Sequence, residues 1–130
     1  MLISITKEKT FTPDFNGNLD LPEGERIIVK YRVPNIATKN RISPRPVLKF
    51  NYDTDGRLEG GETEVSSDAK TIISEMLVSI RNCEYEDEKG KHIVTSAKDL
   101  FEAPVEFEPL VKEIEKKFRN ELEQRLDEKN

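Results

Sequence analysis

Apolar and polar residues alternate along the first half of the chain, which is the pattern of half-buried β-strands. Residues 2–6 alternate in this way and predict a first short strand. Arg26–Val33 predicts a second strand, with Ile27, Val29, Tyr31 and Val33 on one face and Ile28, Lys30 and Arg32 on the other. Val47–Tyr52 predicts a third.

Residues that favour turns separate these strands. Phe11–Asp20 contains Asn16-Gly17, a dipeptide typical of tight hairpin turns. Pro34, Pro44 and Pro46 bracket a predicted loop, because proline lacks an N–H group and disfavours helix in the residue before it. The segment 53–56 then closes the third strand.

From Ser66 onward the apolar period becomes that of a helix. The spacing over Asp68–Ile80 predicts a helix, with Ser66 or Ser67 as its N-cap. Its apolar stripe consists of Ala69, Ile72, Ile73, Met76, Leu77 and Ile80. The following segment, Glu84–Lys91, is predicted to be a polar link with Gly90 as its turn residue.

Two further helices are predicted. Ser96 and Asp99 approximate a capping box that starts a short helix ended by Pro104. The last helix is expected to begin near Glu108, with Pro109 at its first position and Leu110, Val111, Ile114, Phe118, Leu122 and Leu126 as its apolar stripe. Its polar face offers the i, i+4 pairs Glu113–Lys117, Glu115–Arg119 and Glu121–Arg125, each worth about 0.2–0.5 kcal/mol.

Together these elements predict one α+β domain over residues 1–130, mostly β over 1–60 and mostly α over 65–128. A small antiparallel sheet from the N-terminal half is expected to pack with two longer helices and one short helix. The length of 130 residues is typical of a single domain.

Composition excludes several classes of protein. No uninterrupted apolar run exceeds three residues, so a membrane-spanning helix is not expected. The first residues lack the basic and apolar regions of a secretory signal. One Cys excludes an internal disulfide and is consistent with the cytoplasm, and one His excludes a multi-His metal site.

Charge is distributed unevenly. Between Arg26 and Tyr52 there are seven bases and no acids, whereas the remaining residues hold 14 bases against 26 acids, a net of −12. From the basic segment, Lys30, Arg32, Arg41 and Arg45 are predicted to bind an acidic protein surface or to form an ordinary solvated face. Nucleic acid is a less favoured ligand, because the pI is about 5.1.

Candidate chemistry is sparse. The segment 53–56 with Glu62 resembles a calcium loop only faintly, because the EF-hand spacing is not met. His92 and Cys83 lie nine residues apart and form a catalytic pair only if the fold brings them together. The acids Glu84, Glu86, Asp87 and Glu88 are expected to be solvated. We therefore predict no catalytic, cofactor-binding or metal-binding residues and a non-enzymatic protein.

The order of elements in the second half resembles a known family. It consists of the predicted helix Asp68–Ile80, the link RNCEYEDEKGKHI at 81–93, the segment SAKDLF at 96–101 and LVKEI at 110–114. This order is similar to that of the small tail assembly chaperones of long-tailed bacteriophages. The resemblance implies a non-enzymatic protein of the host cytoplasm that binds the tape-measure protein, recruits tail-tube subunits and self-associates.

Two other functions remain open on the sequence. One is a structural component of a phage tail or neck that uses its β half for assembly, and the other is a nucleic-acid-binding module that uses the basic segment 26–52. The stripe Leu110, Val111, Ile114, Phe118 and Leu122 is a candidate helix-in-groove contact with a partner. Alternatively, it packs on Ile72, Met76 and Ile80 of the same chain.

Overall fold

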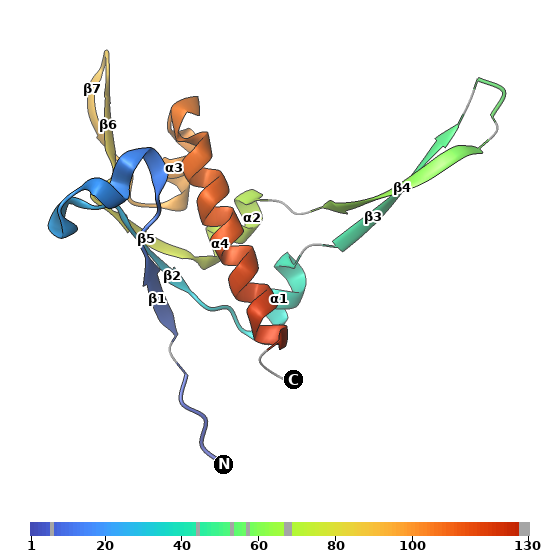
Figure 1. Cartoon of the computed structure of the whole chain (residues 1–130), viewed down its shortest axis with the longest axis horizontal. Helices are drawn as coiled ribbons and strands as arrows, with labels where there is room; N and C mark the ends of the chain where they lie inside the picture. The colour runs from blue at the N-terminus through green and yellow to red at the C-terminus, as the bar shows by residue number, and fades with distance from the viewer. Residues whose placement is uncertain (6, 44, 53, 57, 67–68, 128–130) are drawn as a thin grey trace.

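The chain folds into an α+β body from which one β-hairpin extends (Figure 1). The computed structural model describes residues 1–5, 7–43, 45–52, 54–56, 58–66 and 69–127, and their side chains outside 45–52, 58–66 and 124–127. The strands are β1 (Glu8–Phe11), β2 (Ile28–Arg32), β3 (Arg45–Tyr52), β4 (Leu58–Ser66), β5 (Leu77–Arg81), β6 (Glu84–Asp87) and β7 (Gly90–Ile93). The α-helices are α1 (Ile36–Ile42), α2 (Ala69–Met76), α3 (Ala97–Glu102) and α4 (Glu108–Asp127), and the 3-10 helices are η1 (Phe15–Asp20), η2 (Glu23–Glu25) and η3 (Val105–Phe107).

The central sheet has the strand order β1-β2-β5, and both of its pairings are antiparallel. Its register places Phe11 opposite Val29 and Val29 opposite Ile80. The chain reaches β5 only after α1, the β3–β4 hairpin and α2. The predicted single sheet of the N-terminal half is therefore completed by a strand from the second half.

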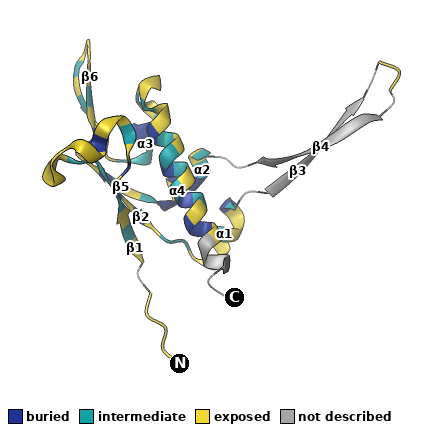
Figure 2. Ribbon diagram, in the orientation of Figure 1, coloured by how far each residue is buried: buried dark blue, intermediate teal, exposed yellow. Residues whose placement is uncertain are grey.

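The core lies between this sheet, α2 and α4. Figure 2 shows buried residues along α4 and α2. Phe118 of α4 packs against Tyr31 of β2, with ring centroids 5.1 Å apart. The fully buried members contributed by α2 and α4 are Ile72, Ile73, Met76, Leu110, Ile114 and Phe118. Helical spacing of these residues puts them on one face of each helix, which explains why both helices form.

A partly buried ion pair joins the first strand to the last helix. The Lys9 ammonium lies 2.6 Å from Oε1 of Glu121, and the Tyr31 hydroxyl donates to Oε2 of Glu121 at 3.4 Å. Glu121 is only 5% exposed, so its carboxylate depends on these two donors. The predicted helical pair Glu121–Arg125 includes Arg125, whose side chain lies outside the described ones.

Several predicted elements are confirmed. The strands predicted at Arg26–Val33 and Val47–Tyr52 correspond to β2 and β3. The two C-terminal helices correspond to α3 and α4, and the Ser96 side chain accepts from the Asp99 N–H as an N-cap. The pair Glu115–Arg119 is formed, whereas Glu113 instead accepts from the backbone N–H of Asp14 at 2.6 Å.

Three predictions about the first half are corrected. Residues 2–5 form no strand, and the first strand is β1 at Glu8–Phe11, whose partner strand continues the sheet. The proline-bracketed segment contains α1, which begins after Asn35 because the Asn35 side chain accepts from the Thr38 N–H at 2.8 Å. Asn16 and Gly17 have φ of 50° and 75°, but they lie within η1 rather than in a two-residue hairpin turn.

The second half is less helical than predicted. The helix expected over Asp68–Ile80 ends at Met76, and Leu77–Arg81 forms β5 because it pairs with β2. The polar link is the β6–β7 hairpin, in which Gly90 has a φ of 118°. Ser66 ends β4 rather than capping a helix, and the alternative cap Ser67 lies outside the described residues.

The β3–β4 hairpin forms a two-stranded sheet of its own. Figure 1 shows that it extends away from the body, with its turn at the far end. That turn includes Gly56, whose φ of 79° suits glycine. The hairpin therefore lies apart from the core described above.

Replacing Glu121 with Gln tests the ion pair that joins β1 to α4. We expect the free energy of unfolding to fall by about 1–3 kcal/mol, because the partly buried Lys9 contact loses its charge partner. Glu123→Gln, an exposed position on the same helix, is the control and should change it by less than about 0.5 kcal/mol. Equal effects in urea unfolding would show that the ion pair does not stabilise the fold.

The hydrogen bonds of the Asp99 carboxylate at the start of α3 should make the free energy of unfolding depend on pH. The Thr95 N–H and hydroxyl donate to the Asp99 carboxylate, at 3.2 and 3.1 Å, and they hold its pKa below its usual value. A lowered folded-state pKa means that this stabilisation is present above the unfolded pKa of 3.8 and is lost as pH falls through the folded value. Asp99→Asn should therefore be less stable than wild type at about pH 7, with the difference vanishing near about pH 2.

Candidate functional site

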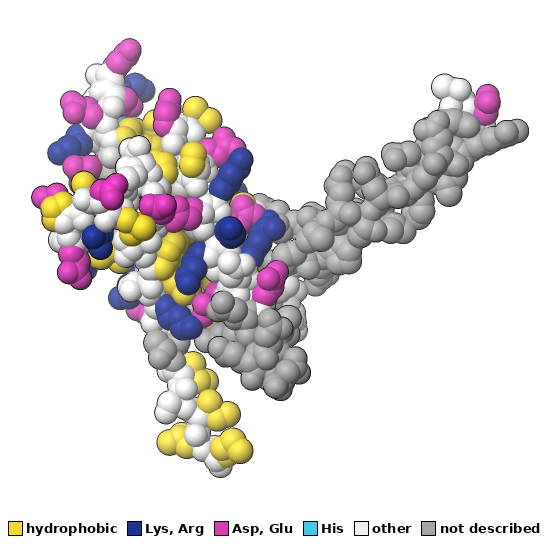
Figure 3. Space-filling model, in the orientation of Figure 1, with side chains coloured by type: hydrophobic (Ala, Val, Ile, Leu, Met, Phe, Trp, Pro, Cys, Tyr) yellow, Lys and Arg dark blue, Asp and Glu magenta, His cyan; other side chains and the backbone are white. Residues whose placement is uncertain are grey.

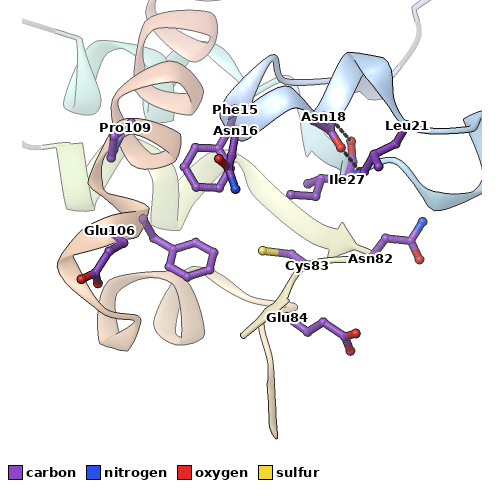
Figure 4. A pocket seen from close by; sticks show the side chains of 11 residues that line it. Phe15, Asn16, Asn18, Leu21, Ile27, Asn82, Cys83, Glu84, Glu106 and Pro109 are labelled. Atoms are coloured by element: carbon purple, nitrogen blue, oxygen red, sulfur yellow. Dashed lines mark hydrogen bonds between the residues drawn. The ribbon is translucent and has the colours of Figure 1, made fainter. Parts of the chain in front are cut away.

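An open cleft of about 630 Å³ lies where η1, the end of β5 and η3 meet. Its lining includes Phe15, Ile27, Cys83 and Phe107. Figure 4 shows the Cys83 sulfur directed into the cleft, whereas the side chains of Asn82 and Glu84 point away from it. The lining of the cleft is mainly apolar.

Two asparagines hold the walls of this cleft. Asn18, 2% exposed, accepts from the Ile27 N–H at 2.6 Å and donates to the Pro13 and Ile27 carbonyls. Asn82, with a φ of 61°, donates to the carbonyls of Gly24 and Arg26 at 3.1 and 2.9 Å. Because both side-chain amides are hydrogen-bonded to backbone groups, the two asparagines fix the conformation of the loops that form the cleft.

A row of half-buried rings crosses the body from the cleft to the β6–β7 hairpin. The ring of Phe15 lies 5.6 Å from that of Phe107, and Phe107 lies 5.5 Å from Tyr85. Tyr85 in turn stacks on His92 at 4.8 Å. These ring contacts hold the β6–β7 hairpin against η3. They explain the position of His92 by packing, so no catalytic role is needed to explain it.

His92 and Cys83 do not form a nucleophile–base pair in the described structure. His92 Nε2 lies 2.9 Å from Oδ1 of Asp87, which lowers the pKa of the Asp87 carboxyl together with the Lys89 N–H. Cys83 is 2% exposed, and burial, reinforced by the nearby Glu84 charge, raises the pKa of its thiol to about 11. A thiol of that pKa is a poor nucleophile at neutral pH.

Two acidic residues of the link, Glu84 and Asp87, pair with bases across the β6–β7 hairpin. Glu84 lies 3.4 Å from Lys91, and Asp87 contacts His92. Among the residues that the structure describes, no group of three or more His, Cys, Asp or Glu side chains could hold a metal ion. The faint calcium loop at 53–56 and Glu62 falls partly outside the described side chains.

The predicted basic surface is partly neutralised by acids of the same chain. Lys30 and Arg32 share a strand face, as predicted, and lie 3.0 and 3.9 Å from the Glu8 carboxylate of the neighbouring strand. Arg41 lies 2.6 Å from Glu75. Arg45 begins β3, and its side chain lies outside the described ones. Three of the four predicted bases are thus paired with acids of the same chain.

The predicted partner-binding stripe of the last helix lies inside the molecule. Leu110, Ile114 and Phe118 are fully buried and Leu122 is 3% exposed, while Val111 is half-buried against the same core. They pack with Ile72, Met76 and Ile80, which was the alternative interpretation. The stripe is therefore part of the chain's own core, and binding of a partner through it stays a prediction.

Two features that were not predicted as binding surfaces project from the body (Figure 1). Met1, Leu2, Ile3 and Ile5 are 66–114% exposed, and Figure 3 shows hydrophobic side chains along this segment, which stands apart from the body. At its base an apolar groove of about 620 Å³ runs past Val33 and Ile36. The second feature is the β3–β4 hairpin. Its second strand escaped prediction because Leu58–Ser66 contains few apolar residues and two adjacent glycines.

Comparisons with protein-family models, curated proteins and solved structures gave no significant match to this chain. In the part of the chain that the structure describes, no helix has both the length and the apolar character needed to cross a membrane. Functional inference therefore rests on the geometry of the molecule.

The Cys83 thiol should be chemically inert in the folded protein. With a pKa of about 11 against an ordinary 9.0, its thiolate fraction at about pH 8 is about 100-fold lower, so alkylation by iodoacetamide should slow at least in proportion. The same protein in urea is the control. Equal rates in the two conditions, measured by mass spectrometry, would contradict the burial of this thiol.

Proposed function

We propose that this protein is a non-enzymatic assembly protein that binds other protein chains through its β3–β4 hairpin. The observation behind this proposal is the combination of the hairpin's projection from the body with its pattern of residues (Figure 1). A two-stranded hairpin without a core to pack on is only marginally stable in water. Contact with another chain would supply the missing packing.

The register of the hairpin separates apolar from charged positions. Alternate positions of β3 are Pro46, Leu48, Phe50 and Tyr52, and their cross-strand partners in β4 are Val65, Thr63, Gly61 and Leu58. As far as Phe50 and Gly61, this set has no charged residue and belongs to one face, because strand positions alternate between faces. The register shifts between Asn51 and Tyr52, and Glu59, which the register leaves unpaired, follows Gly61 in the alternation of β4. All charges within the paired register, Arg45, Lys49, Glu62 and Glu64, belong to the other set. An amphipathic hairpin of this kind suits a protein partner.

Among assembly roles, a structural component of a phage tail or neck has the better support. The β3–β4 hairpin and the exposed residues 1–5 both belong to the first half of the chain. The apolar stripe of α4, through which a chaperone could bind its client protein, is part of the core instead. The phage setting itself comes from the resemblance in the second half of the sequence. The partners are then tail proteins, including the tail-tube subunit.

A tail assembly chaperone is the second candidate. The exposed apolar residues Met1, Leu2, Ile3 and Ile5 support it, because a chaperone needs uncovered apolar surface with which to shield its client, here the tape-measure protein. A nucleic-acid-binding role has less support, because Lys30, Arg32 and Arg41 are paired with Glu8 and Glu75. The host cytoplasm, where tails assemble, is the proposed location for both phage roles.

Replacing residues 46–65 with a short Gly-Ser linker tests the proposed function. The body should remain folded, with an unchanged unfolding midpoint, because the core residues lie outside the hairpin. In a phage that encodes this chain, the deletion should abolish tail assembly. Lys98→Glu, an exposed change on α3, is the control and should assemble normally. Normal tails from the deletion variant would contradict a role for the hairpin.

Mass spectrometry of purified virions distinguishes the two phage roles. A structural component should be present in fixed stoichiometry, whereas a chaperone should be absent from virions but should raise the soluble yield of a co-expressed tape-measure protein. A protein that is absent from virions and leaves that yield unchanged has neither role.

A further inference from the structure

The central sheet packs one face against α2 and α4 and leaves the other face open. Positions of β2 that alternate with the buried Val29 and Tyr31 belong to the open face, and cross-strand pairing adds the residues directly opposite them in β1 and β5. The open face defined by this register consists of Glu8, Thr10, Ile28, Lys30, Arg32, Ser79 and Arg81. None of these seven residues is buried, so the described part of the chain leaves this face uncovered.

This open face is basic in a protein that is acidic as a whole. It carries three bases, Lys30, Arg32 and Arg81, against one acid, Glu8, whereas the net charge of the whole chain is −5. Arg81 belongs to the second half of the chain and joins the other two bases only because β5 pairs with β2. The tertiary structure thus assembles a basic surface that the linear sequence does not contain.

One carboxylate on this face serves two of the bases. Oε2 of Glu8 lies 3.0 Å from the Lys30 ammonium, and Oε1 lies 3.9 Å from the Arg32 guanidinium. Arg81 takes part in no ion pair within the described part of the chain. The side chains of Lys30 and Arg32 are 46% and 63% exposed, and ion pairs at such exposed sites are weak. All three bases can therefore contact a carboxylate of another molecule.

We propose that the open face of the central sheet binds an acidic segment of another protein, with carboxylates of that segment on Lys30, Arg32 and Arg81. Charge complementarity selects this partner, because the face has an excess of positive charge. Ile28, half-buried and directly opposite Arg81, adds an apolar contact for an aliphatic side chain of the partner. This inference goes beyond the proposed function, because the face lies outside the β3–β4 hairpin and takes a different surface of a partner.

The composition of the face favours a polypeptide over nucleic acid. None of its seven residues is aromatic, whereas proteins that bind single strands stack the bases on aromatic side chains. A phosphate backbone also has a high density of negative charge, which Glu8 and the net charge of −5 oppose. A segment with a few carboxylates needs no more than the three bases present.

Fluorescence anisotropy with a labelled peptide tests this proposal on the full-length chain. The probe is a fluorescein-labelled peptide of alternating Glu and Val, about eight residues long, and the control peptide has Gln in place of Glu. We expect the acidic peptide to bind at about 50 mM NaCl and to bind more weakly at about 300 mM, because exposed charges are screened by salt. No binding at about 50 mM, or equal binding of the Gln peptide, would overturn the proposal.

Two neutralising variants should change this affinity in opposite directions. Arg81→Gln should weaken binding of the acidic peptide at least about threefold, whereas Glu8→Gln, which removes the competing carboxylate, should tighten it by about the same factor. Lys98→Gln, with the same loss of one positive charge on α3, is the control and should bind as wild type does. Tighter binding by Glu8→Gln cannot result from loss of folding. Equal weakening in Arg81→Gln and Lys98→Gln, or no tightening in Glu8→Gln, would overturn the proposal.

A labelled oligothymidine of about eight nucleotides distinguishes nucleic acid from protein as the ligand. Weaker binding of the oligothymidine than of the acidic peptide supports the proposal, and tighter binding would overturn it. The proposed function is tested separately, because no residue of the open face lies in the β3–β4 hairpin. Loss of tail assembly on deletion of residues 46–65 would support that function even if the acidic peptide did not bind.

Discussion

The packing of Phe118 against Tyr31, with ring centroids 5.1 Å apart, is the contact on which the rest of the body depends. It joins the last helix to the central strand of the sheet, and the Glu121 carboxylate, one turn further along, ties the same helix to Lys9 of β1. Phe11 of β1 also lies against Phe118, at 6.4 Å. Residues from both ends of the sequence thus close a single core.

This arrangement determines which surfaces remain for binding. The apolar side of α4 is used inside the molecule, so a partner cannot reach it without unfolding the body. The basic residues of β2 share one acid, Glu8, and Cys83 is enclosed with a raised pKa. The segments that project from the body include the long β3–β4 hairpin, the shorter β6–β7 hairpin and the exposed residues 1–5 (Figure 1). The proposed function assigns contacts with other protein chains to the β3–β4 hairpin.

The sequence predicted an element well where one periodicity dominated. Apolar and polar residues alternate from Val29 to Val33, and the stripe of α4 repeats at helical spacing, so β2 and α4 were expected. Leu77 and Ile80 fit a continuing helix equally well, and only pairing with β2 makes that segment a strand. The β6–β7 hairpin was not predicted, because acids and lysines occupy so many of its positions that apolar and polar residues do not alternate visibly. For the candidate site, the bases were identified, but their partners Glu8 and Glu75 lie 22 or more residues away in sequence.

By itself, the sequence determined the α+β class, the two C-terminal helices, the positions of most turns and the separation of a basic segment from an acidic remainder. These properties depend on residues that are near one another along the chain. The tertiary structure alone decided that β5 completes the sheet of the first half, that the stripe of α4 is internal, and that the β3–β4 hairpin extends from the body. The reason is physical: local periodicity shows that a face is apolar, but only the packing of distant segments decides what covers it.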